Sequence, residues 1–294
     1  MRSKRLIPVV LATTLGLTLT ACGGPENTDP MADGKITIGI VGATPVQDAF
    51  KEVAAQNDVT VEFVDFSDYS QPNPALKSGD IDMNWFQHIA YLADYNQASG
   101  KDLTLIGTTE IIPLPLYSKK YKDVSEFKKG DTVAIPNDTV NQARAINVLV
   151  AAGLLKLSNE TIRPEPKDID EAASTVKVQT VAAQQTVNAL ESVQGSVINN
   201  TFSADAGIDT NTALFKDDPQ ADSAKPFVNG FAVRRADREN ETYKKVAKLW
   251  SDPEVQKSIV KQSGGTAKVV SDRSQADLDK ILGDLTTEIK KSNS

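Results

Sequence analysis

Residues 35–55 read KITIGIVGATPVQDAFKEVAA and contain the first β-α unit of the chain. Lys35 to Val41 alternates and is rich in β-branched residues, so it is expected to form a strand. Gly42 to Pro45 is a turn sequence, and Val46 to Ala55 has the spacing of a helix. A strand that leads through a short turn into a helix is typical of α/β proteins.

The same alternation continues along the chain. Further strands are expected at 59–66, 81–85, 103–111, 132–135, 176–181 and 196–198. Further helices are expected at 72–78, 88–98, 139–152, 183–192, 239–250, 253–262 and 274–291. This pattern predicts mixed sheets that are covered by helices.

Two segments interrupt the pattern and are expected to cross between two lobes. Residues 112–117 contain Pro113 and Pro115, which cannot both lie inside a central strand. Residues 226–233 are apolar and extended and would carry the chain back. We therefore expect an α/β protein with two mixed-sheet lobes joined by two crossover strands, and a ligand in the cleft. A single large doubly wound sheet would give a similar pattern and stays open.

The crossings set the expected domain boundaries. Lobe 1 would contain residues 35–115 and 232–294, and lobe 2 would contain residues 116–231. The N-terminal segment before residue 35 is expected to lie outside both lobes.

This N-terminal segment has the features of an export signal. Basic residues at 2–5 precede an uncharged apolar run that is too short for a comfortable membrane span. The run ends in Leu19-Thr20-Ala21-Cys22, which resembles the bacterial lipobox. Residues 1–21 are therefore expected to be a signal peptide, and residues 22–34 a lipidated Cys22 followed by a flexible tether. The protein would be extracytoplasmic and anchored to the cell membrane by lipid.

The composition argues against several classes of function. The net charge is -7, whereas nucleic-acid-binding surfaces are basic. His88 is the only histidine and Cys22 the only cysteine, so a zinc site of histidines and cysteines is excluded. The chain has no P-loop and no G-x-S-x-G motif. Asp80 and Asp82 leave a carboxylate-dependent hydrolase open, although their setting is that of a solvated turn.

Polar and aromatic residues gather at four junctions of the expected elements, namely 84–91, 136–144, 197–202 and 227–231. In the first, His88 and Tyr91 would share a helix face. In the second, a helix capped by Asp138 or Thr139 would present Asn141 and Arg144 on one face.

At these four junctions the chain resembles the methionine-binding lipoproteins of bacterial ABC importers. The resemblance extends from Lys35 to about Arg235, and the lipobox agrees with it. Further family-like stretches, in the same order along the chain, are 66–69, 79–82, 86–88, 116–120 and 134–138.

The resemblance implies a two-lobed periplasmic-binding-protein fold of type II-like form, no catalysis, no cofactor and no metal. It places Arg144 and Asn141 on the carboxylate of a free amino acid, and Asn199 and Asn229 on its α-amino and carboxylate groups. The walls around the ligand side chain would be Tyr69, Phe86, His88 and Tyr91. The expected partners are L-methionine or a related amino acid, an ABC permease and ATPase complex, and the membrane through Cys22. A monomer is expected, with no nucleic acid.

The chain departs from the family pattern at Trp85, Asn200 and Phe202, and it lacks an acidic residue directly before the first crossing. These departures leave D-methionine, a short methionine-containing peptide or another apolar amino acid open as the ligand. A lipid-anchored hydrolase and a surface lipoprotein without a transport role are the alternatives from other functional classes.

Overall fold

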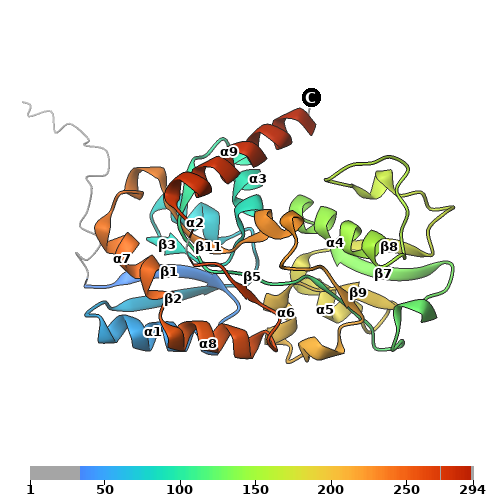
Figure 1. Cartoon of the computed structure of the whole chain (residues 1–294), viewed down its shortest axis with the longest axis horizontal. Helices are drawn as coiled ribbons and strands as arrows, with labels where there is room; N and C mark the ends of the chain where they lie inside the picture. The colour runs from blue at the N-terminus through green and yellow to red at the C-terminus, as the bar shows by residue number, and fades with distance from the viewer. Residues whose placement is uncertain (1–33, 272, 293–294) are drawn as a thin grey trace, which may run out of the picture.

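The computed structural model describes residues 34–271 and 273–292 (Figure 1). The expected signal peptide, Cys22 and nearly all of the expected tether lie outside the described residues. Among the described helices, none is long and apolar enough to span a membrane.

The chain forms two separate five-stranded sheets, which stand side by side in Figure 1. We name the part of the protein around the first sheet lobe 1. Its strands, in spatial order, are β2 (Val61–Phe66), β1 (Ile36–Val41), β3 (Met83–Asn84), β11 (Gly230–Arg234) and β4 (Leu103–Thr108). β1 pairs in parallel with β2 and β3, whereas β11 runs antiparallel to β3 and β4.

The second sheet is the centre of lobe 2. Its strands, in spatial order, are β10 (Phe215–Lys216), β6 (Pro115–Tyr117), β9 (Gly195–Val197), β7 (Asp131–Pro136) and β8 (Val176–Val181). β7 is parallel to β8 and β9, and β6 is antiparallel to its neighbours. Two separate mixed sheets exclude the single doubly wound sheet, because no strand is shared between them.

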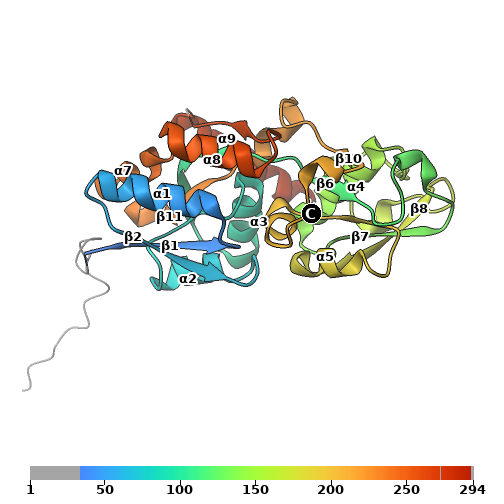
Figure 2. The same ribbon diagram turned by 90° about the horizontal axis from the view of Figure 1, so that it is seen from below.

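Helices cover both faces of the lobe 1 sheet, and each face has its own apolar core. In Figure 2, α1 and α8 lie on one side of this sheet and α2 on the other. The helices of the first face are α1 (Pro45–Gln56), α7 (Glu241–Leu249) and α8 (Pro253–Gln262). The helices of the second face are α2 (Pro72–Ser78), α3 (Ile89–Ser99) and α9 (Gln275–Ser292).

Lobe 2 has shorter helices. α4 (Thr139–Ala151) packs on its sheet and supplies much of the core of this lobe. The remaining helical segments are α5 (Thr186–Ala189), α6 (Asn200–Asp205) and the 3-10 turns η1 (Val124–Glu126), η2 (Pro166–Asp168), η3 (Ala183–Gln185), η4 (Thr210–Thr212) and η5 (Asp222–Phe227). In lobe 1, η6 (Arg235–Asp237) follows β11.

The two crossings differ in detail from the sequence expectation. The strand expected at 103–111 is divided, because Glu110–Ile111 leaves the lobe 1 sheet and forms β5, which pairs with β12 (Lys268–Val269). Pro115 already pairs in the lobe 2 sheet, while Gly230 and Phe231 already pair in the lobe 1 sheet.

Two expected elements were wrong in type. Residues 226–233 are not extended throughout, because η5 continues to Phe227 before β11 begins. The helix expected at 183–192 is a 3-10 turn followed by the short α5.

A substitution of Phe50, which belongs to α1, tests how much the core on the first face of lobe 1 contributes to stability. Its side chain is fully buried and its ring contacts those of Phe63, Trp85 and Phe231. Phe50→Ala should therefore lower the free energy of unfolding by about 3–5 kcal/mol, because it leaves a cavity among these rings. Urea unfolding followed by circular dichroism measures the change.

The matched control is Ile162→Ala, since Ile162 is 72% exposed and should change the free energy of unfolding by less than about 0.5 kcal/mol. Equal effects of the two substitutions would contradict this view of the core.

Candidate functional site

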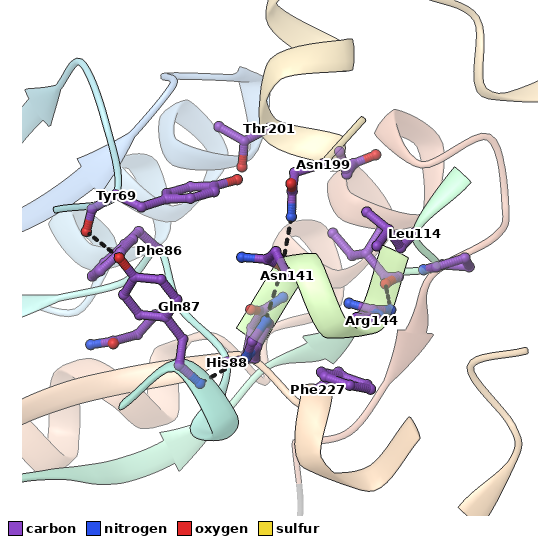
Figure 3. A pocket seen from close by; sticks show the side chains of 15 residues that line it. Tyr69, Phe86, Gln87, His88, Leu114, Asn141, Arg144, Asn199, Thr201 and Phe227 are labelled. Atoms are coloured by element: carbon purple, nitrogen blue, oxygen red, sulfur yellow. Dashed lines mark hydrogen bonds between the residues drawn. The ribbon is translucent and has the colours of Figure 1, made fainter. Parts of the chain in front are cut away.

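A cavity lies where the two lobes and both crossings meet (Figure 3). It contains about 520 Å³ of empty space, a volume that includes solvent at its open mouth. All eight ligand-binding residues expected from the sequence line it, namely Tyr69, Phe86, His88, Tyr91, Asn141, Arg144, Asn199 and Asn229. They come from five separate segments of the chain, so the fold brings together residues that are distant in sequence.

One wall of the cavity is aromatic. The ring centroids of Tyr69 and Phe86 are 5.9 Å apart, and those of Phe86 and Tyr91 are 5.8 Å apart. Tyr69 and Tyr91 meet edge to face at 6.1 Å, and the Tyr91 hydroxyl donates to the Tyr69 backbone oxygen at 3.1 Å. Three mutually contacting rings form a rigid apolar surface that suits an apolar ligand group.

Three buried amides hold the segment that carries Phe86 and His88. Asn73 Nδ2 donates to Gln87 Oε1 at 2.9 Å, and Asn84 Nδ2 donates to Asn73 Oδ1 at 2.9 Å. Gln87 Nε2 completes the triangle by donating to Asn73 Oδ1 and Asn84 Oδ1. Buried amides whose hydrogen bonds are satisfied by one another fix a backbone segment in one conformation.

His88 caps α3 and turns its ring into the cavity. Its Nδ1 accepts from the Tyr91 backbone N–H at 3.1 Å, so the proton of the neutral ring lies on Nε2. Nε2 then donates to Asn141 Oδ1 at 3.4 Å. Burial, and next the nearby Arg144 cation, lower the pKa of His88 to about 3. The imidazole is therefore a neutral donor at physiological pH.

A chain of polar groups connects the N-termini of α4 and α6. Asp138 caps α4 by accepting from the Asn141 backbone at 2.9 Å, and its Oδ1 also accepts from Asn141 Nδ2 at 2.9 Å. Asn141 Oδ1 accepts from Asn199 Nδ2 at 2.9 Å. Asn199 does not cap α6 with its side chain. Its buried Oδ1 has no partner among the described residues, which leaves one acceptor beside the cavity.

Arg144 forms the polar end of the cavity, opposite the aromatic wall (Figure 3). It is 6% exposed, and its guanidinium lies over the ring of Phe227 with 4.2 Å to the centroid. Nε donates to Asp217 Oδ2 at 2.7 Å, and Nη2 donates to the Ile112 backbone oxygen at 2.8 Å. Its Nη1 donors have no partner in residues 34–271 and 273–292. Among the described lining residues, Arg144 alone has a charged side chain.

Asn229 lies on the return crossing and is fixed through its backbone. Its N–H donates to the Glu110 oxygen at 2.8 Å, and its own oxygen accepts from the Thr109 N–H at 2.9 Å. It also forms an isolated β-bridge with His88. The side chain of Asn229 thus sits on the framework that joins the two lobes.

Sequence reasoning missed other residues of the cavity, namely Gln87, Ile112, Pro113, Leu114, Asn200, Thr201 and Phe227, and it missed Asp217 behind Arg144. Phe227 was inside an expected junction, and its position two residues before Asn229 was the available signal. Asp217 gave no signal, because it follows the two-residue strand β10.

Two residues considered in the sequence lie elsewhere. Asp82 accepts from the Thr37 backbone and hydroxyl and from the Tyr243 hydroxyl, all inside lobe 1. Asp80 accepts from Ser78 at 2.5 Å. Neither carboxylate lines the cavity, and no group of three or more histidine, cysteine, aspartate or glutamate residues that could hold a metal ion occurs in the described part of the chain.

The lobes also touch outside the cavity. Asp94 of α3 accepts from the Thr139 hydroxyl of lobe 2 at 2.7 Å and forms an ion pair with Arg163 of lobe 2 at 2.7 Å. Elsewhere, the Thr210 hydroxyl of lobe 2 donates to the Ser263 backbone oxygen of lobe 1 at 3.3 Å. The two lobes are therefore in direct contact at these places as well as through the crossings.

Comparison with protein families and curated proteins gives consistent matches. The family model described as NlpA lipoprotein matches residues 36–270. The D-methionine-binding lipoprotein MetQ of Escherichia coli (strain K12) is 34% identical over 258 residues, which cover 85% of this chain and 92% of that protein.

Solved structures are similar over the same range. Protein PG110 from Staphylococcus aureus has a TM-score of 0.80 and 40% identity, and the match covers 85% of this chain and 100% of that chain. A nutrient binding protein from Burkholderia cenocepacia, solved bound to methionine, has a TM-score of 0.75 and 32% identity, with 80% of this chain and 99% of that chain covered. These likenesses confirm the two-lobed periplasmic-binding-protein fold.

The neutral state of His88 can be tested by NMR. Because its pKa in the folded protein is about 3, the Cε1 proton should not titrate between pH 8 and pH 5. The single histidine makes the signal unambiguous. Unfolded chain binds this proton near pH 6.5, so the free energy of unfolding should fall by up to about 1.4 kcal/mol per pH unit below that value.

Urea-unfolded protein is the control and should titrate near its ordinary pKa of about 6.5. A midpoint near 6.5 in the folded protein would show that the imidazole is neither buried nor held beside Arg144.

Proposed function

Because this chain belongs to the NlpA lipoprotein family, we propose that it is a lipid-anchored extracytoplasmic binding protein that captures methionine, or a close analogue, and delivers it to an ABC importer. The observation that carries the proposal is the buried guanidinium of Arg144, which faces an aromatic wall across a cavity between two lobes. The similar D-methionine-binding lipoprotein of Escherichia coli and the similar Burkholderia cenocepacia protein bound to methionine support the same ligand.

The acid group of the ligand would bind Arg144. The unpartnered donors of Nη1 can meet a carboxylate, and charge-assisted hydrogen bonds of this kind are strong in a site shielded from water. The bonds to Asp217 and Ile112 hold the guanidinium in place before the ligand arrives. Little ordering cost would therefore remain for binding.

The ammonium group would bind amide oxygens. Asn199 Oδ1 is a buried acceptor that has no hydrogen-bond partner among the described residues. Asn229 lines the same cavity. Amide oxygens satisfy an ammonium without a second buried negative charge. This arrangement suits a zwitterion, because the one charged lining side chain is already paired with Asp217 behind it.

The ligand side chain would lie against Tyr69, Phe86 and Tyr91. A thioether gains about 0.3–1.5 kcal/mol from each sulfur–ring contact, beyond the burial of its area. Burial of a methionine-sized side chain adds about 1.5–3 kcal/mol. These terms favour methionine over a shorter apolar amino acid.

Closure would prepare the protein for delivery. The Asp94 contacts to Thr139 and Arg163 exist only when the lobes are together, so a ligand that bridges the lobes would shift the population to the closed form. A lipid on Cys22 would keep this closed form near a membrane-embedded importer.

Arg144→Ala tests the proposed function. It should weaken binding of methionine by about 3–5 kcal/mol, since the ligand carboxylate would be buried without a partner. This is about two to three and a half orders of magnitude in Kd. Isothermal titration calorimetry with L- and D-methionine, on protein unfolded and refolded to remove retained ligand, measures the loss.

Arg144→Lys should recover only part of the affinity, because lysine lacks the planar set of donors. The matched control is Arg235→Ala: Arg235 pairs with Asp102 on lobe 1, away from the cavity, and its loss should leave Kd unchanged. Unaltered affinity in a folded Arg144→Ala protein would refute the proposed role.

A further inference from the structure

Glu110 is a buried carboxyl group that the proposed binding contacts do not use. It is 4% exposed, and its Oε2 has no hydrogen-bond partner within the described ranges. The residue opens β5, and Ile111 separates it from the first crossing. It lines a second cavity that adjoins the binding cavity and shares Asn229 and Phe86 with it.

Glu110 and Asn229 are joined by both backbone and side chain. The Asn229 N–H donates to the Glu110 backbone oxygen at 2.8 Å, and Asn229 Nδ2 donates to Glu110 Oε1 at 3.1 Å. Glu110 Oε1 accepts a hydrogen bond, so the amide of Asn229 must turn its NH2 group, and not its oxygen, toward Glu110. The side-chain oxygen of Asn229 then points away from Glu110 and can accept from another group.

We propose that Glu110 is a positioning residue, which holds the Asn229 amide so that its oxygen is available to the ammonium group of the bound amino acid. This inference rests on the proposed function, because it needs a ligand with an ammonium group. Glu110 itself would not touch the ligand and would act through Asn229.

The same geometry couples binding to a proton. Burial raises the pKa of Glu110 to about 7, although the nearby Thr109 hydroxyl and the hydrogen bond from Asn229 act in the opposite direction. The positive ammonium group of the ligand would be separated from Glu110 only by the Asn229 amide. It would favour the ionised carboxylate of Glu110 and so lower the pKa of this group. Since the carboxyl is already buried, the ligand adds little further desolvation. Binding should therefore release a proton, and affinity should rise with pH through the range below 7.

Other titratable or charged groups lie on the elements that contact β5 or line the two cavities. Lys268 of β12 and Asp222 and Lys225 of η5 belong to elements in contact with β5, and Lys261 belongs to α8, which lines the second cavity. His88 and Arg144 line the adjoining binding cavity, and Asp138 caps the α4 helix that carries Arg144. Asp222 and Lys225 pair with each other, and His88 stays neutral above pH 5 because its pKa is about 3. Burial also raises the pKa of Asp138, so the test must separate Asp138 from Glu110.

Calorimetry at pH 5.5 and 7.5, in buffers of different ionisation enthalpy, tests the inference on wild type, Glu110→Gln and Glu110→Leu. Wild type should bind methionine roughly threefold or more tightly at pH 7.5 and should release protons on binding. Glu110→Gln keeps an acceptor for Asn229 Nδ2 but cannot titrate. Because its amide is neutral like the protonated carboxyl, it should bind at both pH values with roughly the weaker affinity that wild type has at pH 5.5, and lose both the pH dependence and the proton release.

Glu110→Leu removes the acceptor and should weaken binding about tenfold at both pH values, the effect of one lost buried hydrogen bond. Melting temperatures of the three proteins show that each is folded. Wild-type pH dependence in Glu110→Gln would assign the proton to another group, such as Asp138, and would overturn the coupling. Wild-type affinity in Glu110→Leu would overturn the positioning role. Absence of methionine binding by wild type itself would instead overturn the proposed function.

Discussion

A cation buried between two lobes needs fixed partners, and the position of Arg144 satisfies this need with groups from three parts of the chain. Asp217 follows the lobe 2 sheet, the Ile112 oxygen belongs to the first crossing, and the Phe227 ring precedes the second. The guanidinium therefore connects the framework of lobe 2 with both connections to lobe 1. A group that binds its remaining donors would contact the part of the fold on which lobe movement depends.

The other residues that line the cavity add no second charge beside Arg144. The neighbouring imidazole of His88 stays neutral, and Asn141 accepts from both His88 and Asn199. The facing wall of Tyr69, Phe86 and Tyr91 carries no charge. Under the proposed function, a polar end with one cation and a rigid apolar wall would together select a small zwitterion with an apolar side chain. The hydrogen-bonded amides of Asn73, Asn84 and Gln87 hold the segment that carries Phe86, so the aromatic wall is in place without a ligand.

The sequence predicted the family, the two-lobed fold and eight of the fifteen residues that line the cavity, because these depend on patterns and motifs that are local in the chain. Strands with alternating residues, and the helix starts at His88 and Asp138, are encoded within a few positions. The partner of Arg144 could not be predicted, since Asp217 is brought to it by pairing between β10 and β6, which are distant in sequence. Phe227 was hidden because a 3-10 turn replaces the expected strand there. Trp85, a departure from the family pattern, points into the core of lobe 1 among Phe50 and Phe231 and does not line the binding cavity.

The most direct test is a crystal structure of the protein, with ordinary methionine residues, grown with L-selenomethionine as the ligand. The anomalous signal of selenium locates the ligand side chain independently of the protein. Our account places the selenium against the rings of Tyr69, Phe86 and Tyr91, with the ligand carboxylate on the Arg144 guanidinium. Selenium bound outside this cavity, or a carboxylate that does not contact Arg144, would contradict it.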